Sequence, residues 1–184
     1  MSTSSEKYKT GCTFLIVRKN KILLFNIYRF KVKILLKSKA IIGKNGFAYF
    51  KKEGDKKTPL GIFSPRFAFG LKERPDTALN YVKITPDHYF VDDIKSRFYN
   101  KLICVKKSPK DFSSAEHLYE YKSEYQYAID IGYNKACKKG RGSAIFLHCI
   151  GEKPYTAGCI AVKEKDILIC LKYLSLNSKI LIIP

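Results

Sequence analysis

Three short strand-like runs, mainly apolar, lie near the start of the chain. These runs are rich in Ile, Leu, Val, Phe and Tyr, are separated by short basic turns, and cover residues 13–17, 21–28 and 31–37. Strand-forming residues interrupted by turns at this spacing predict an antiparallel meander. Residues 40–50 are predicted to add a further strand and turn, and Thr58-Pro59 to form a tight turn into a strand at Ile62-Phe63.

The centre of the chain, residues 64–126, is less regular. Its clearest local signal is Ser113 followed three residues later by Glu116, a spacing typical of a helix N-terminus in which the two side chains cap the first turn. A short helix from Ser113 through Tyr121 is therefore predicted. The neighbouring carboxylates Asp92 and Asp93 are predicted to lie in a loop. Adjacent residues of an extended chain point to opposite sides, so they do not form a glycosidase-type carboxylate pair.

The last third of the chain combines strands with one helical pattern. Strands are predicted at 125–133, 144–148 and 179–183. Between the last two, apolar residues recur at helical spacing, which predicts a helix over 163–174. The whole pattern predicts a mostly β single domain, a sandwich or barrel with one or two short helices, over residues 12–184 after a polar leader at 1–11.

Length and composition fit one folded domain. The chain has 184 residues, of which 46% are hydrophobic, and this excludes a disordered chain. The net charge of +19 comes from 35 Lys and Arg against 16 Asp and Glu, with the lysines spread along the chain. Three explanations of this charge remain possible, namely a nucleic-acid binder, an enzyme that acts on anionic polymers, and a Lys-rich surface without a specific role. No helix-turn-helix, zinc-finger or RNA-binding signature accompanies the charge.

Cysteine and histidine are too dispersed to predict a metal site. The six cysteines contain no C-x-x-C pair, and the three histidines share no ligand spacing with them. No metal or other cofactor is therefore predicted, while disulfides and free thiols both stay open. No apolar run reaches the ~18–20 residues of a membrane span. The polar N-terminus shows no signal peptide, so either a signal has been removed or export does not use that route.

One cysteine and one histidine are placed to act together. His148 ends an apolar run and Cys159 opens the next, with a Gly/Pro-containing loop between them. An imidazole beside a thiol takes its proton and stabilises a thiolate–imidazolium pair. Because Gly158 has no Cβ, a substrate carbonyl can approach the N–H groups of Gly158 and Cys159, an oxyanion-hole arrangement. Spacing alone fits a second interpretation equally well, in which Cys159 is a small buried apolar residue and His148 makes ordinary structural hydrogen bonds.

These residues resemble the catalytic signature of the L,D-transpeptidases of the YkuD type. That signature has a histidine ahead of a Ser/Thr-x-Gly-Cys block, which here is His148 followed by Thr156, Gly158 and Cys159. A second element, residues 54–63, resembles the family's D-x-x-T-P-x-G-x-F pattern. The resemblance is strongest over 40–184.

Two positions depart from the family's commonest form. Ala157 stands where a second histidine is common, and Ala161 stands where Asn or Arg is common. The nucleophile and the base are retained, so the departures bear on which donor and acceptor peptides are used.

The resemblance implies a β-rich fold and a role for each motif residue. Cys159 is expected to attack a stem-peptide carbonyl of peptidoglycan between an L- and a D-centre, giving a thioester. His148 is expected to be the general base and acid, with its ring held by the main-chain carbonyl of Cys149. Gly158 and Cys159 are expected to form the oxyanion hole.

Two further residues are candidates for substrate binding. The Thr156 hydroxyl is expected to hydrogen-bond the imidazole or the substrate. A hydroxyl that only stabilises the turn is an almost equally good interpretation. Arg141, in a Gly-Arg-Gly turn, is expected to clamp a stem carboxylate, and a solvated loop arginine is the alternative.

Three functions stay in competition at the level of sequence. The first is a peptidoglycan L,D-transpeptidase. The second is an L,D-carboxypeptidase, or a D-amino-acid-exchanging variant of the same site. The third is a basic wall- or nucleic-acid-binding module without catalysis. For the first, the expected partners are stem peptides and not nucleic acid, the expected location is the periplasm or cell wall, and the expected state is a monomer.

Overall fold

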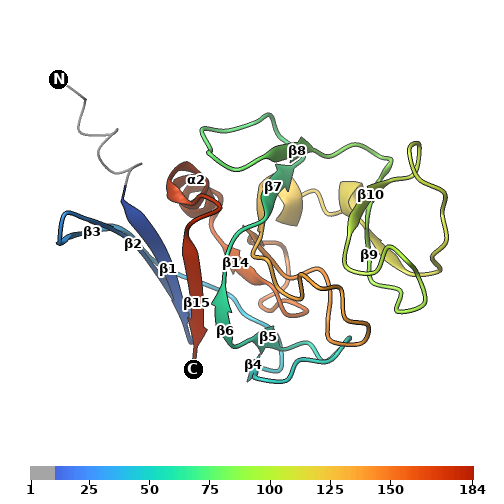
Figure 1. The fold of residues 1–184 in the computed structure, drawn as a ribbon, viewed down its shortest axis with the longest axis horizontal. Coiled ribbons are helices and arrows are strands. Elements are labelled where there is room, and N and C mark those ends of the chain that lie inside the picture. The colour runs from blue at the N-terminus through green and yellow to red at the C-terminus, as the bar shows by residue number, and fades with distance from the viewer. Residues whose placement is uncertain (1–10) are drawn as a thin grey trace.

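The computed structural model describes residues 11–184, and its largest elements are two five-stranded sheets (Figure 1). The first sheet has the strand order β3-β2-β1-β15-β6. Its strands are β1 (Cys12–Arg18), β2 (Lys21–Tyr28), β3 (Lys31–Lys39), β6 (Gly61–Phe63) and β15 (Lys179–Ile183). The first three form the predicted meander, and the last strand of the chain runs parallel to β1 and antiparallel to β6. The C-terminal strand therefore closes the N-terminal meander into one sheet.

The second sheet has the order β14-β13-β12-β7-β8. Its strands are β7 (Phe67–Gly70), β8 (Tyr81–Lys83), β12 (Ala128–Asp130), β13 (Phe146–Cys149) and β14 (Ile160–Val162). The pair β13–β14 is parallel, and β13 is antiparallel to β12. The outer edge of β14 is covered by the segment after β3, where Ile41 and Ala161 exchange main-chain hydrogen bonds of 2.8 Å.

Two small sheets complete the β-structure. One has the order β10-β9-β11, from β9 (His88–Val91), β10 (Leu102–Cys104) and β11 (Ala115–His117), and lies at the far end of the molecule from the first sheet (Figure 1). The other pairs β4 (Phe47–Ala48) with β5 (Thr58–Pro59). Most of the strand expected over 40–50 is therefore irregular.

The predicted helix from Ser113 to Tyr121 is wrong. Residues 115–117 form β11, and only the single 3-10 turn η1 (Leu118–Glu120) follows. The N–H and the hydroxyl of Ser113 both donate to Asp93, at 2.8 Å each, so the predicted cap is used to join two loops. Pairing with β9 outweighs the local helix signal. The strand expected over 125–133 is likewise shortened to β12, after the 3-10 turn η2 (Glu124–Gln126).

The helix α2 (Glu164–Tyr173) confirms the amphipathic pattern over 163–174. Its buried face includes Ile167, Cys170 and Leu171, which lie in one core cluster with residues of both large sheets. In the first sheet, alternate residues such as Leu15 and Val17 point into this core, as the period of two requires. The helix thus packs between the two sheets and joins them through one core.

Over residues 11–184, the fold confirms a mostly β single domain, in which α2 is the one α-helix. Both large sheets are open, so the sandwich description is correct and the barrel description is not. In the part of the chain that the structure describes, no helix is long and apolar enough to cross a membrane.

The position of β15 between β1 and β6 generates a prediction about stability. Ile180 is fully buried in the core, whereas Leu181, next to it, lies on the opposite, partly exposed face of the sheet. Ile180→Ala is expected to lower the free energy of unfolding by about 2–5 kcal/mol because it leaves a cavity. Leu181→Ala, the matched control, is expected to cost clearly less. Denaturant unfolding measures both, and equal losses would contradict the assigned faces.

Candidate active site

The strands β13 and β14 place His148 and Cys159 on the same face of the second sheet. In β13, Leu147 and Cys149 point into the core between the sheets, so Phe146 and His148 point to the other side. In the parallel strand β14, Ala161 lies opposite His148, and Cys159 is two residues before Ala161. The alternation of a strand therefore brings the imidazole and the thiol to one surface.

Both side chains line one cavity of about 310 Å³. His148 is 6% and Cys159 7% exposed. Cys159 also lines a second cavity, of about 180 Å³, which does not include His148. The wall behind them is an aromatic cluster in which Tyr125 packs edge-on to His148, with ring centroids 5.6 Å apart. Ala157 and Ala161, the two departures from the family pattern, also line the cavity.

The His148 ring is held in one orientation by its own strand. Its Nδ1 lies 2.7 Å from the carbonyl oxygen of Cys149, the contact that the resemblance implied. A carbonyl only accepts, so Nδ1 carries the proton and Nε2 has the free lone pair. Burial lowers the pKa of His148 to about 4, although the hydrogen bond to Cys149 acts in the opposite direction. The imidazole is therefore neutral at pH 7 and able to accept a proton.

The Cys159 thiol is protonated in this structure. Its Sγ donates to the carbonyl oxygen of Ala144 at 3.1 Å and accepts from the N–H of Phe146 at 3.3 Å. Burial raises the pKa of the thiol well above its usual range, and the nearby Glu116 carboxyl adds to the rise. The expected thiolate–imidazolium pair is thus not favoured in the free protein, because burial disfavours the charged form of both groups.

Two buried threonines hold the turn that carries the cysteine. Thr156 Oγ1 donates to the Cys159 carbonyl at 2.7 Å and accepts from the Gly158 N–H at 3.1 Å. Thr58 Oγ1, from β5, lies 3.3 Å from the same carbonyl and accepts from the N–H of Gly43 at 2.8 Å. The hydroxyl of Thr156, a predicted substrate ligand, is therefore used within the turn. The Thr-Pro element and the cysteine block, far apart in sequence, meet here.

Gly158 is the residue of this turn that only glycine can fill. Its φ is +139°, a region that side chains rarely adopt. A Cβ on Gly158 would lie 2.8 Å from the Lys57 carbonyl oxygen and 3.2 Å from Lys51 Nζ. The position is thus restricted both by conformation and by space.

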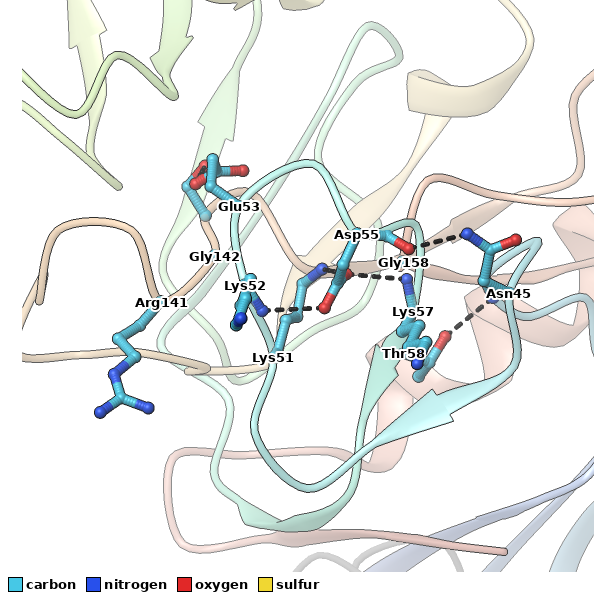
Figure 2. Close-up of polar contacts among 12 residues, drawn as sticks. Asn45, Lys51, Lys52, Glu53, Asp55, Lys57, Thr58, Arg141, Gly142 and Gly158 are labelled. Atoms are coloured by element: carbon cyan, nitrogen blue, oxygen red, sulfur yellow. Dashed lines mark hydrogen bonds and ion pairs between the residues drawn. The ribbon is translucent and has the colours of Figure 1, made fainter.

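The buried Lys51 forms an ion pair with the partly exposed Asp55 beside that glycine (Figure 2). The pair distance is 2.6 Å, and Lys51 is only 3% exposed. Burial by itself would raise the pKa of Asp55, but the hydrogen bonds from Lys51 and from the N–H groups of Lys52 and Lys57 outweigh it and lower that pKa. The sequence analysis missed Lys51; the signal that could have found it is Asp55, the first residue of the D-x-x-T-P pattern.

Arg141 is not brought into the site. Its side chain points away from the Lys51–Asp55 pair in Figure 2 and lines neither cavity beside Cys159. Its main-chain carbonyl accepts the Tyr133 hydroxyl at 2.5 Å, which holds the loop and leaves the guanidinium exposed. The alternative reading of a solvated loop arginine therefore describes it better.

A second carboxyl group next to the cysteine was also missed. Glu116, on β11, lines the same cavity as His148 and accepts the Tyr125 hydroxyl at 2.6 Å. Burial raises the pKa of Glu116 to about 7, the Tyr125 hydrogen bond lowers it, and the carboxylates of Asp92 and Glu53 add to the rise. Its only sequence signal was the misleading resemblance to a helix cap.

A β-rich domain with a buried thiol and a buried imidazole in one cavity can be compared with known families. The chain matches the family model of the L,D-transpeptidase catalytic domain, YkuD, over residues 13–182. It therefore belongs to the YkuD family of L,D-transpeptidase catalytic domains. The match also takes in the N-terminal meander, which lies outside the region of strongest motif resemblance. No curated protein matched the chain.

Several solved structures are similar to the chain at low sequence identity. The helical cell shape determining protein Pgp2 from Campylobacter jejuni is 14% identical with a TM-score of 0.53, covering 94% of this chain and 47% of that one. Bd1075 from Bdellovibrio bacteriovorus is 19% identical, with a TM-score of 0.49 and coverages of 94% and 48%. An L,D-transpeptidase from Mycobacterium smegmatis is 12% identical, with a TM-score of 0.47 and coverages of 95% and 59%. The chain spans about half the length of the first two.

The Gly158 geometry predicts a substitution effect. Gly158→Ala is expected to lower the melting temperature for two reasons. The added Cβ would lie too close to the Lys57 carbonyl oxygen, and alanine disfavours the positive φ at this position. Gly140, with φ +76° and no atom within 4 Å of an added Cβ, is the matched control. Gly140→Ala is expected to lower the free energy of unfolding by only the cost of the positive φ, about 1–2 kcal/mol. Thermal unfolding compares the two, and an equal loss would contradict the close approach at Gly158.

The raised pKa of Glu116 predicts a pH-dependent stability. A carboxyl with a folded-state pKa of about 7 costs stability above pH 7 and nothing well below its ordinary pKa of 4.5. Glu116→Gln keeps an acceptor for Tyr125 and removes the charge. The variant is therefore expected to melt several degrees above the wild type at pH 8, with the difference shrinking towards pH 4.5. Calorimetry at both pH values tests this, and a pH-independent difference would contradict it.

Proposed function

We propose that this protein is a peptidoglycan L,D-transpeptidase that acts on stem peptides through a thioester on Cys159. The single observation that supports this most is the shared cavity of Cys159 and His148, with Nδ1 of the ring fixed on the Cys149 carbonyl and Nε2 free. Family membership supports the reaction class. The buried, neutral resting state of both groups suits proton transfer that accompanies attack on a substrate.

Acylation proceeds in two balanced steps. First, His148 Nε2 takes the thiol proton as Sγ forms a bond to the scissile carbonyl carbon, whose oxygen becomes an oxyanion. The Cys159 N–H is the donor for that oxyanion, because the Gly158 N–H is already bonded to Thr156. Then the C–N bond breaks, and the imidazolium returns its proton to the departing amine. The products are a thioester on Cys159 and a released D-residue.

The thioester is then resolved by an acceptor amine in transpeptidation. Water in place of the amine gives L,D-carboxypeptidase activity, and a free D-amino acid gives exchange. All three share the acylation half-reaction, so they are alternatives for the same site. We place the activity at the periplasm or cell wall with stem peptides as partners, and expect a monomer that does not depend on nucleic acid.

Acylation by a carbapenem, a mimic of the donor peptide, provides the test. The wild type is expected to gain the mass of one carbapenem. Cys159→Ala is expected to gain none, and His148→Ala to react about 100-fold or more slowly, since it lacks the base. Cys170→Ala is the control, because Cys170 is fully buried in the core beneath α2. Intact-mass spectrometry over time measures each rate.

Labelling of Cys159→Ala by the carbapenem would contradict the assigned nucleophile. A wild type that is never acylated, yet binds DNA with a steep salt dependence, would favour the remaining alternative, a basic binding module without catalysis. Cross-linked dimers against trimmed stems, formed from a tetrapeptide substrate, separate the transpeptidase from the carboxypeptidase.

A further inference from the structure

The middle of the first sheet is apolar on both of its faces. Leu15 and Val17 of β1 point into the core between the sheets, so Phe14 and Ile16 point to the outer side. The strand pairing puts further apolar side chains on that outer side, namely Leu23, Phe25, Ile27, Val32, Ile34 and Leu181. An antiparallel meander with one face in a core normally carries polar residues on its other face. An apolar outer face therefore indicates that something covers it.

No described segment covers this outer face. None of its apolar residues belongs to any of the three core clusters within residues 11–184. Phe14 and Phe25 only stack on each other there, with ring centroids 5.4 Å apart. Exposure is greatest on the edge strand β3, where Val32 is 64% and Ile34 51% exposed. The exposed apolar area is therefore concentrated on the β2–β3 hairpin, which lies at the opposite end of the molecule from β9 and β10 (Figure 1).

The turn of this hairpin carries a phenylalanine where the backbone favours a small polar residue. Arg29 and Phe30 connect the two strands with φ of 46° and 63°, in the left-handed region. Two-residue turns of this kind are normally built from Asn and Gly, because a bulky side chain is strained at positive φ. The Phe30 side chain is nevertheless fully exposed to solvent. It costs conformational energy without contributing to the core of the described residues, so its use lies in a contact outside them.

The first sheet is strongly basic as well as apolar. Residues 11–39, which include β1, β2 and β3, contain eight Lys or Arg and no Asp or Glu, and β6 and β15 add no acid. Lys31 and Lys37 are exposed and take part in none of the ion pairs that join residues within 11–184. Their charges are therefore available to an anionic partner.

An open groove at the other end of the same face combines the two properties again. Its volume is about 1000 Å³, and Arg18, Lys21 and Lys39 line it together with Ile16 and Leu23. The pairing of β1 with β2 and of β2 with β3 puts these side chains on the outer side of the sheet. The outer face is thus apolar along its middle and cationic at both ends.

The charge of this face decides which partner fits it. A second copy of the chain would place one basic sheet against another, and each copy has a net charge of +19, so self-association here is disfavoured. The lysines of β3 likewise oppose the addition of a further strand at its edge. A bilayer with anionic phospholipids offers both complements, an acyl region for the apolar side chains and phosphate groups for the Lys and Arg side chains.

We propose that the outer face of the first sheet, with Phe30 at the tip of its hairpin, docks on a bilayer surface that carries anionic phospholipids. Phe30 and Val32 enter the boundary between head groups and acyl chains, and Lys31 and Lys37 contact the phosphates. The inference does not rest on the proposed reaction, because no residue of this sheet lines either cavity beside Cys159. Docking would hold the domain at a membrane while both cavities stay open.

Co-sedimentation with lipid vesicles tests the docking surface. Vesicles of phosphatidylcholine and phosphatidylglycerol in equal parts are compared with vesicles of phosphatidylcholine alone. The wild type is expected to bind the anionic vesicles and to lose most of this binding on the neutral ones, because apolar insertion and charge attraction act together.

Phe30→Asn separates docking from folding. Asn adopts positive φ readily, so the melting temperature is expected to stay equal or to rise. The affinity for anionic vesicles is expected to fall about tenfold, because the ring that enters the bilayer is lost. Phe50→Asn is the matched control, since Phe50 is 82% exposed and lies outside the first sheet. Its vesicle affinity is expected to equal that of the wild type.

A pair of double variants tests the cations at constant net charge. Lys31→Gln with Lys37→Gln is expected to weaken vesicle binding about fivefold for each cation removed. Lys95→Gln with Lys101→Gln, between β9 and β10 at the far end of the molecule, is the matched control and is expected to weaken it much less.

Three results would overturn the docking surface. The first is a wild type that binds no anionic vesicles. The second is an equal loss in the two double variants, or unchanged binding of Phe30→Asn, since the vesicles would then attract only the net charge. The third is a wild-type dimer in sedimentation velocity that Phe30→Asn converts to a monomer, since a second copy would then cover this face.

Discussion

The parallel pairing of β13 with β14 is the constraint on which the site depends. It sets His148 opposite Ala161 and puts Cys159 just before the strand, on the face away from the main core. A register shift of one residue would turn the imidazole into the apolar core and Leu147 into the cavity. The core between the sheets therefore also specifies the site, because burying Leu147 and Cys149 leaves His148 no other direction. The two threonines and the Lys51–Asp55 pair then shape the turn around Cys159.

Burial and charge act together to set the protonation of the site. His148 and Cys159 are both buried enough to favour their neutral forms, so in the proposed reaction charge develops only once a substrate is bound. Glu116 is held in an environment that disfavours its negative charge. The thiol, the imidazole and one carboxyl group of the same cavity thus have pKa values shifted by burial, a pattern found at functional sites.

Much of the fold and the central pair of residues could be predicted from sequence, and the reasons are local. The meander and the helix α2 follow from hydrophobic periodicity, which local sequence carries directly. The helix from Ser113 to Tyr121 was wrong because capping residues report only local preference, and pairing with β9 outweighs it. Arg141 was expected in the site because it is near His148 in sequence, but its loop turns the side chain outward. Glu116 was missed as a site residue because nothing in its spacing links it to Cys159. Lys51 was missed because its link to the site runs through its ion pair with Asp55.

The sequence by itself determined the N-terminal meander, the helix α2 and the order of the two motifs that place the chain in its family. It also singled out Cys159, His148 and the glycine at 158, because these residues resemble the catalytic signature of the family. Only the tertiary structure decided which face those residues share, that the thiol is neutral, and which carboxylates surround it. The physical reason is that burial and charge at Cys159 come from segments up to about a hundred residues away, such as Thr58, 101 positions earlier. Such contacts arise from packing between sheets and leave no periodic signal in the chain.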